Sequence, residues 1–147
     1  MNEIKFYTPK CEYGYMSNFY KCNQIIDGEL YITNEHYYQS QKAITNDMKK
    51  WIRQAPTPYS AMMAGRNLKK SELRPDWETF KISVMLNGLK HKFNQNKDLN
   101  DKLISTGDSV IHEDSPTDMV WGILGEDMLG KLLMKVREEI ILGGNIK

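Results

Sequence analysis

The sequence predicts a compact, mostly helical α+β domain with a small N-terminal β-hairpin. Residues 25–32 place apolar residues on both sides of Asp27-Gly28, a pair typical of a two-residue hairpin turn. Beyond residue 33, most apolar residues recur at helical spacing. The chain has 147 residues, 40% of them hydrophobic and 27% charged, which suits one core without disulfides or metal. No linker or repeat divides it, so residues 1–147 are predicted to form a single domain.

The elements are expected from local signals in chain order. Residues 4–7 have strand character, and the hairpin follows. Thr33 is a good N-cap for a helix that continues to residue 42, and Thr57 caps another that begins at Pro58 and runs towards Gly65. Further elements are expected at 47–55 (helix), after Pro75-Asp76 (a longer helix), at 99–104 (helix), at 110–111 (a candidate strand), at 114–126 (loop) and at 128–140 (a helix ending at Gly143-Gly144).

The sequence also predicts which side chains of these helices are buried and which are exposed. Trp77, Phe80 and Val84 form one apolar stripe of the long helix and are expected in the core. The basic clusters Lys69-Lys70 and Lys90-His91-Lys92 are interpreted as solvated helix surface. With a formal net charge of only +1, the protein lacks the strong positive field that favours tight binding to duplex DNA.

Composition and motif spacing exclude several classes of protein. The N-terminal residues have no apolar run for a signal peptide, and no stretch is apolar enough to span a membrane. Cys11 and Cys22 are therefore expected to be reduced in an intracellular, cytoplasmic protein. The three histidines are far apart and two cysteines do not make a zinc set, so no metal is expected. Without a glycine-rich phosphate or dinucleotide motif, no cofactor is expected either.

The stretch from Thr33 to Lys42 is the strongest candidate for chemistry. In a helix, Glu35, Tyr38, Gln39 and Lys42 stand at i, i+3, i+4 and i+7 and share one face. A carboxylate, an aromatic ring, an amide and an amine on one stripe suit a polar ligand rather than a hydrophobic core. Glu in the first turn and Lys near the last would equally be expected from the helix dipole alone.

Cleavage of a bond between a sugar carbon and a base nitrogen would use these residue types directly. Such a bond breaks through a cation-like sugar, so the site needs negative charge near C1 and a proton for the departing base. Glu35 is a candidate for either task. An attacking lysine must first lose its proton, and burial beside aromatic rings lowers the pKa of an amine. Tyr37, Tyr38 and Trp121 are the rings expected beside Lys42.

A collinear series of short motifs gives the sequence a family resemblance. The series is Met16-Ser17-Asn18-Phe19-Tyr20, residues 34–43, Ala64-Gly65-Arg66, Lys92-Phe93-Asn94-Gln95-Asn96, Thr106-Gly107-Asp108, Ser115-Pro116-Thr117-Asp118, Trp121-Gly122 and Leu129-Gly130-Lys131-Leu132-Leu133-Met134. Each motif alone is weak, but their order is highly specific. Together they resemble the NADAR family, also called YbiA-like proteins, over residues 6–140.

The resemblance implies an N-glycosidase with a compact α+β fold. Characterised members of that family cleave early riboflavin-pathway intermediates, which are ribosylamino-pyrimidine phosphates, or remove ADP-ribose from guanine in DNA. The family's mechanism is thought to use a lysine that forms an imine with C1 of the opened sugar, and by motif that lysine matches Lys42. Implied partners are a small nucleotide-like substrate and ADP-ribosylated DNA. The rival reading is a module that binds ADP-ribose or NAD without turning it over.

The remaining candidates each have a second interpretation. Asp118 would orient ribose hydroxyls or water, or is a plain turn residue. Arg66 would clamp a phosphate, or caps the carbonyls of a helix end. Trp121 would stack on a base, or anchors the core. The other expected substrate contacts are Asn18, Phe19 (which is equally suited to the core), Tyr38, Gln39 and Gly122, which would let backbone approach a ligand or simply make a turn.

One stretch departs from the family pattern. Many members have a longer loop between Trp-Gly and the final helix, whereas here only residues 123–127 separate Trp121-Gly122 from that helix. Asp127 stands where an asparagine is common. The shorter loop is expected to leave the pocket more open, or to change which leaving group it holds.

Overall fold

The computed structural model describes residues 2–143. Its elements are β1 (Glu3–Phe6), a 3-10 turn η1 (Gly14–Met16), β2 (Gln24–Ile26), β3 (Glu29–Tyr31), α1 (Asn34–Ser40), α2 (Asn46–Arg53), α3 (Pro58–Arg66), α4 (Trp77–Gln95), α5 (Lys97–Ser105), β4 (Val110–Glu113) and α6 (Met128–Ile141). The mostly helical α+β fold predicted from the sequence is confirmed. Within the described range, none of the helices has the length and apolar character needed to cross a membrane.

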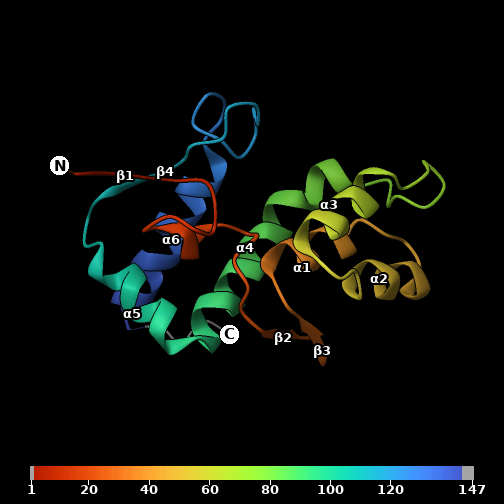
Figure 1. Cartoon of the computed structure of the whole chain (residues 1–147), viewed down its shortest axis with the longest axis horizontal. Coiled ribbons are helices and arrows are strands. Elements are labelled where there is room, and N and C mark those ends of the chain that lie inside the picture. The colour runs from red at the N-terminus through yellow and green to blue at the C-terminus, as the bar shows by residue number, and fades with distance from the viewer. Residues whose placement is uncertain (1, 144–147) are drawn as a thin grey trace.

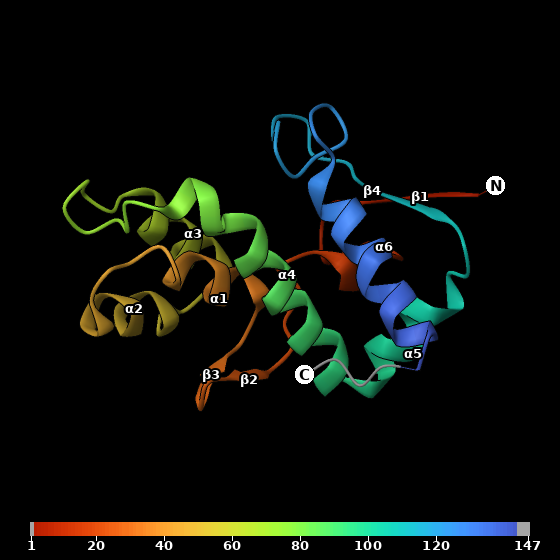
Figure 2. The same ribbon diagram turned by 180° about the vertical axis from the view of Figure 1, so that it is seen from behind.

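Helix α4 runs through the middle of the molecule (Figure 1). Helices α1, α2 and α3 lie on one side of it, while α5, α6 and the β1–β4 pair lie on the other. The view from behind shows the same division, with the loop between β4 and α6 projecting beside the start of α6 (Figure 2). Helices α1 and α6 both contact α4, so one helix connects the two sides.

Two small sheets complete the fold. β2 and β3 form the predicted antiparallel hairpin, and Asp27 (φ 53°) and Gly28 (φ 80°) supply the two positive φ angles of its turn. β1 pairs in parallel with β4, with Phe6 opposite Glu113. This pairing brings the N-terminal strand beside a strand more than 100 residues later in the chain, so the segment after β1 starts next to the loop that follows β4.

The predicted helix starts are confirmed, but one helix is shorter than expected. Thr33 and Thr57 each accept a hydrogen bond from a backbone N–H of the first turn, as predicted N-caps should. Helix α1 ends at Ser40, so the prediction that it continues to Lys42 is wrong. Lys42 lies in the following turn, where its carbonyl accepts a hydrogen bond from Arg74 N at 2.8 Å.

The last helix and the long helix show how tertiary contacts modify sequence patterns. α6 ends close to the predicted place, and Gly143 has the positive φ (83°) of a helix C-terminus, while Gly144 lies outside the described residues.

On α4, Trp77 and Val84 are buried as predicted, but Phe80 is 43% exposed. The guanidinium of Arg74 lies 4.6 Å from the Phe80 ring centroid, so this aromatic ring holds a cation at the surface rather than packing in the core.

Lys92 contradicts the expectation of a solvated basic cluster. Its side chain is fully buried (0% exposed), its Nζ donates to the carbonyl of Ser17 at 2.9 Å, and the ring of Phe93 lies 5.4 Å away. The buried ammonium thereby fixes the backbone just before Asn18. Burial lowers the pKa of Lys92 from 10.5 to about 8, although the neighbouring Cys22 thiol opposes that shift.

This buried amine predicts a pH dependence of stability. Between about pH 8 and pH 10.5 the unfolded chain holds a proton on Lys92 that the folded chain has lost. The Lys92 contribution to the free energy of unfolding should therefore rise with pH across that window, by up to about 3 kcal/mol. Urea unfolding of the wild type and of Lys92→Met at pH 7.5, 8.5 and 9.5 measures it. A constant difference between the two proteins would contradict the prediction.

Candidate active site

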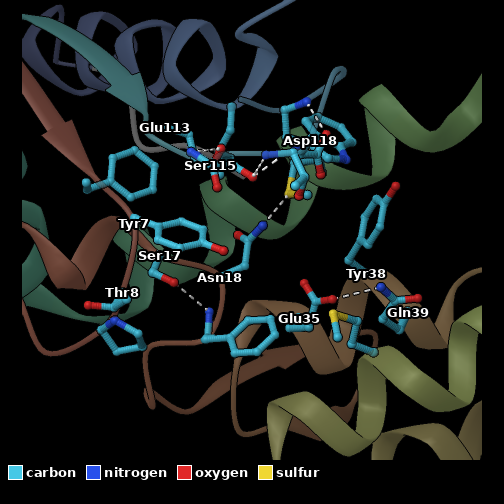
Figure 3. Close-up of a pocket in the computed structure, with 18 of the residues that line it drawn as sticks. Tyr7, Thr8, Ser17, Asn18, Glu35, Tyr38, Gln39, Glu113, Ser115 and Asp118 are labelled. Carbon is cyan, nitrogen blue, oxygen red and sulfur yellow. Dashed lines mark hydrogen bonds between the residues drawn. The ribbon is translucent and has the colours of Figure 1, made fainter. Parts of the chain in front are cut away.

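A cavity of about 460 Å³ lies where the two sides of the molecule meet. Figure 3 shows α1 residues Glu35, Tyr38 and Gln39 along one wall, with Glu113, Ser115 and Asp118 across from them. Ser17 and Asn18 lie between these walls. Of the ten site residues predicted from the sequence, nine line the cavity: Asn18, Phe19, Glu35, Tyr38, Gln39, Lys42, Arg66, Asp118 and Trp121. The tenth, Gly122, is buried beside the cavity without lining it.

Glu35 is held in place by its own helix. Its carboxylate accepts a hydrogen bond of 2.7 Å from Gln39 Nε2, one helical turn away, and its backbone N–H donates to the carbonyl of Asn18. The other amide atom, Gln39 Oε1, is buried without a hydrogen-bond partner and lies against Gly65 of α3. Because Gly65 has no Cβ, α3 can approach α1 closely enough to confine Gln39, and Gln39 in turn orients Glu35 towards the cavity.

Burial raises the pKa of the Glu35 carboxyl above its usual value. The hydrogen bond from Gln39 and the positive charges of Lys42 and Arg66 oppose this rise, while Asp118 adds to it. The residue is only 7% exposed, so the charge of its carboxylate acts in a poorly solvated environment. Glu35 can therefore stabilise a nearby cation strongly, and it gives up its proton less readily than a carboxyl in water.

Lys42 is half-buried between two aromatic rings. Its Nζ lies 5.6 Å from the ring centroid of Tyr38 and 5.9 Å from that of Trp77. Burial lowers the pKa of Lys42, Arg66 lowers it further, and the Glu35 carboxylate raises it. A lysine in this environment gives up its proton more readily than one in water, as an attacking amine must.

The aromatic wall differs in part from the one expected. Tyr38 is present as predicted, and its ring meets those of Trp77 (5.0 Å) and Trp121 (5.6 Å) edge-on. Tyr37 points elsewhere: it packs on Tyr31 and its hydroxyl accepts from Asn87, so its predicted place beside Lys42 is wrong. Trp77 takes that place, a role that its position at the start of an amphipathic helix did not indicate.

Asn18 and Phe19 are fixed by the turn that precedes the hairpin. Ser17 Oγ accepts from the N–H of Phe19, and Asn18 Oδ1 accepts from Asn34 Nδ2 at 2.8 Å. The side chain of Asn18 also donates to Met85 Sδ on α4. These contacts leave the Phe19 ring half-buried at the cavity wall.

The loop after β4 is organised by its own side chains. Asp118 Oδ1 accepts from the N–H groups of Val120 and Trp121, both at 2.9 Å, so Asp118 is a turn residue, as one of its two interpretations predicted. The same residue also lines the cavity. Ser115 Oγ accepts from Asp118 N at 3.0 Å. At Gly122, a Cβ would lie 2.7 Å from the carbonyl of Asp118, so glycine is required for this fold of the loop.

Glu113 also lines the cavity, and the sequence analysis missed it. It is the last residue of β4, and its Oε2 accepts from Ser115 N at 3.2 Å. Burial raises the pKa of Glu113 from 4.5 to about 7, and Asp118, Asp127 and Asp114 add to the rise. The signal in the sequence was an acidic residue that ends a short strand directly before the Ser115-Pro116-Thr117-Asp118 motif.

Arg66 and Asp127 complete the charged surroundings. Arg66 is exposed at the cavity edge, whereas the cap of α3 comes from Asn67, whose N–H and side chain both donate to Met63 O. Asp127 adopts a left-handed backbone (φ 51°), which explains why asparagine suits this position, and its carboxylate contacts His112. Among residues 2–143, no group of three or more His, Cys, Asp or Glu side chains is arranged to hold a metal ion.

Comparison with known proteins identifies the family of this chain. The family model described as the NADAR domain matches residues 5–141. N-glycosidase YbiA of Shigella boydii is 36% identical over 143 residues, covering 95% of this chain and 89% of that protein. A riboflavin biosynthesis protein of Vibrio vulnificus is 34% identical over 141 residues, which cover 93% of this chain and 38% of the longer relative.

A solved structure gives the same result. The NMR structure of the Escherichia coli protein YbiA superimposes with a TM-score of 0.86 at 34% identity, covering 97% of this chain and 86% of that one. The family match thus extends over nearly the whole chain and includes every wall of the cavity. This protein therefore belongs to the NADAR domain family, in which its similar relatives are named N-glycosidases.

Proposed function

We propose that this protein is an N-glycosidase that hydrolyses the bond between ribose C1 and the nitrogen of a ribosylated base, through an imine on Lys42. The observation that carries the proposal is the half-buried Lys42 amine, which is enclosed by Tyr38 and Trp77 beside the buried carboxyl of Glu35. The names of the relatives support the reaction class.

In this mechanism the neutral amine of Lys42 attacks C1 as the base departs with the electron pair of the C1–N bond. The new C1–Nζ bond becomes an imine when the ring oxygen leaves C1 and takes a proton, which opens the sugar. Water then adds to the imine carbon and expels the lysine amine, so the sugar is released with a free C1 and Lys42 is regenerated. The amine lone pair drives both ring opening and imine formation.

The other cavity residues have supporting roles in this proposal. Glu35 stabilises positive charge at C1 or acts as the acid/base group, and Asp118 orients ribose hydroxyls or the attacking water. Arg66 binds phosphate at the cavity edge. Substrate contacts are assigned to Asn18, Phe19, Tyr38, Gln39 and Trp121, while Gly122 supports the loop that carries Asp118.

Two substrates fit the cavity chemistry. ADP-ribosyl-guanine in DNA is our first choice, because the exposed Arg66 at the cavity edge offers positive charge to a pyrophosphate-bearing sugar. A ribosylamino-pyrimidine phosphate from riboflavin biosynthesis is the second, since relatives are named riboflavin biosynthesis proteins. The formal net charge of +1 favours contact with the modified nucleotide over extensive contact with duplex DNA.

Product mass spectrometry tests the proposal. Pure protein is incubated with an oligonucleotide carrying ADP-ribosyl-guanine and, separately, with the ribosylamino-pyrimidine phosphate. Release of free ADP-ribose and restored guanine, or of ribose phosphate and free base, identifies the substrate. If both substrates stay intact and calorimetry shows tight stoichiometric binding of ADP-ribose, the protein is a nucleotide-binding module and the proposed activity is wrong.

A further inference from the structure

Glu113 occupies the cavity wall that faces α1 (Figure 3). The amine of Lys42 approaches from the end of α1, so β4 and its following loop lie on the other side of a sugar held between them. In a displacement at C1, the leaving group departs on the side away from the attacking atom. A group on the β4 wall is therefore placed beside the departing base rather than beside the attacking amine.

The surroundings of Glu113 suit a carboxyl that holds and releases a proton. Only Oε2 has a hydrogen-bond partner among the described residues, the backbone N–H of Ser115. The charged groups that face it are acidic: Asp114, Asp118 and Asp127, the last of which contacts His112. Within residues 2–143 it forms no ion pair with Lys or Arg. The missing Cβ of Gly122, which would lie 2.8 Å from Oε2, makes room for the carboxyl.

We propose that Glu113 is the general acid that protonates the leaving nitrogen as the C1–N bond breaks. This inference rests on the N-glycosidase reaction proposed above. The carboxyl proton passes from Glu113 to the base nitrogen, and the electron pair of the C1–N bond goes to the same nitrogen. The base leaves with its N–H restored, while Glu113 becomes a carboxylate. A water molecule that later attacks the imine returns a proton to it.

The other two carboxyls are less suited to this step. Glu35 lies beside Lys42 on the α1 wall, on the side of the attacking amine rather than of the departing base, and one of its oxygens is bonded to Gln39. Asp118 Oδ1 accepts from two backbone N–H groups, so this carboxyl is held in its own turn. The pKa of Glu113, raised to about 7, leaves a large fraction protonated at neutral pH. Of the three acids, Glu113 is therefore the one assigned to proton donation.

The test separates departure of the base from chemistry at Lys42. Glu113→Gln keeps the size of the side chain but has no proton to give. On the substrate that the wild type cleaves, its kcat should fall about 10²- to 10⁴-fold. The descending high-pH limb of the wild-type rate profile should be absent in the variant. Incubation with ADP-ribose and sodium borohydride reports on Lys42 alone, because the free C1 aldehyde needs no leaving group; the variant should form this reduced adduct as the wild type does.

Matched variants make each outcome informative. Glu138→Gln makes the same change at an exposed glutamate outside the cavity lining and should keep wild-type turnover. Glu113→Asp retains an acid on a shorter arm and should keep the high-pH limb with a lower kcat, which covers the case of a poorly folded Gln variant. Turnover by Glu113→Gln within threefold of wild type overturns this inference and leaves the proposed function standing. A wild type that neither cleaves nor forms the adduct overturns the proposed function, and this inference with it.

Discussion

Lys42→Ala should lose N-glycosidase turnover by on the order of 10³-fold or more, because among residues 2–143 no other amine lies between the rings of Tyr38 and Trp77 to form the covalent intermediate. Lys42→Arg should be equally inactive: the guanidinium keeps the positive charge but stays protonated and cannot attack carbon. Borohydride reduction with ADP-ribose should attach one sugar to the wild type at Lys42 and none at this position in either variant. Peptide mass spectrometry locates the adduct.

Lys50→Ala, on the exposed face of α2, is the matched control for a general loss of lysine and should behave as wild type. Circular dichroism shows whether the Lys42 variants keep the helical fold. Turnover by folded Lys42→Ala at more than a tenth of the wild-type rate would remove the imine from the mechanism.

Glu35→Gln should lower kcat by about 10²-fold or more while making the Lys42 amine easier to deprotonate. The amide can still accept the hydrogen bond from Gln39, so the local structure is kept and only the charge is removed. Loss of that charge weakens stabilisation of the cation-like sugar. The Glu35 carboxylate also raises the pKa of Lys42, so its removal lowers that pKa further.

These two effects have opposite signs and can be measured separately. Steady-state turnover gives the loss in kcat. The pH at which borohydride trapping of ADP-ribose reaches half its maximum follows deprotonation of Lys42 and should move to lower pH in Glu35→Gln. Glu12→Gln, at an exposed site outside the cavity, should change neither quantity. A trapping curve that stays in place or moves to higher pH would show that Glu35 does not act on Lys42 through its charge.

Local sequence signals predicted most of the fold. Thr33 and Thr57 mark helix starts because their hydroxyls satisfy backbone N–H groups within the same turn, and Asp27-Gly28 marks a hairpin because its backbone geometry is local. The parallel pairing of β1 with β4 was not predicted, since nothing near Ile4 indicates a partner at Ile111. Strand pairing across most of the chain is decided by tertiary packing, which local patterns do not contain.

The sequence predicted those site residues whose positions depend on a single helix face. Glu35, Tyr38 and Gln39 share the cavity because of their spacing, and Lys42 reaches it although α1 ends at Ser40, because the next turn continues the same path. Residues whose role depends on a distant element were missed. Trp77 reaches Lys42 through the packing of α4 on α1, and Glu113 through the loop after β4. Lys92 was wrongly predicted to lie at the surface, because the carbonyl of Ser17 that binds its buried amine is distant in the sequence.

The pairing of β1 with β4 also decides when the protein acquires its site during synthesis. A nascent chain that ends before residue 110 already contains Glu35 and Lys42 but has neither the facing wall nor a partner strand for residues 3–6. Closing so long a loop costs chain entropy that contacts made only by the late segments repay. The cavity is therefore completed only once the residues up to Leu129 have been made, and shorter translation products carry Lys42 without Glu113, Asp118 and the rest of the facing wall.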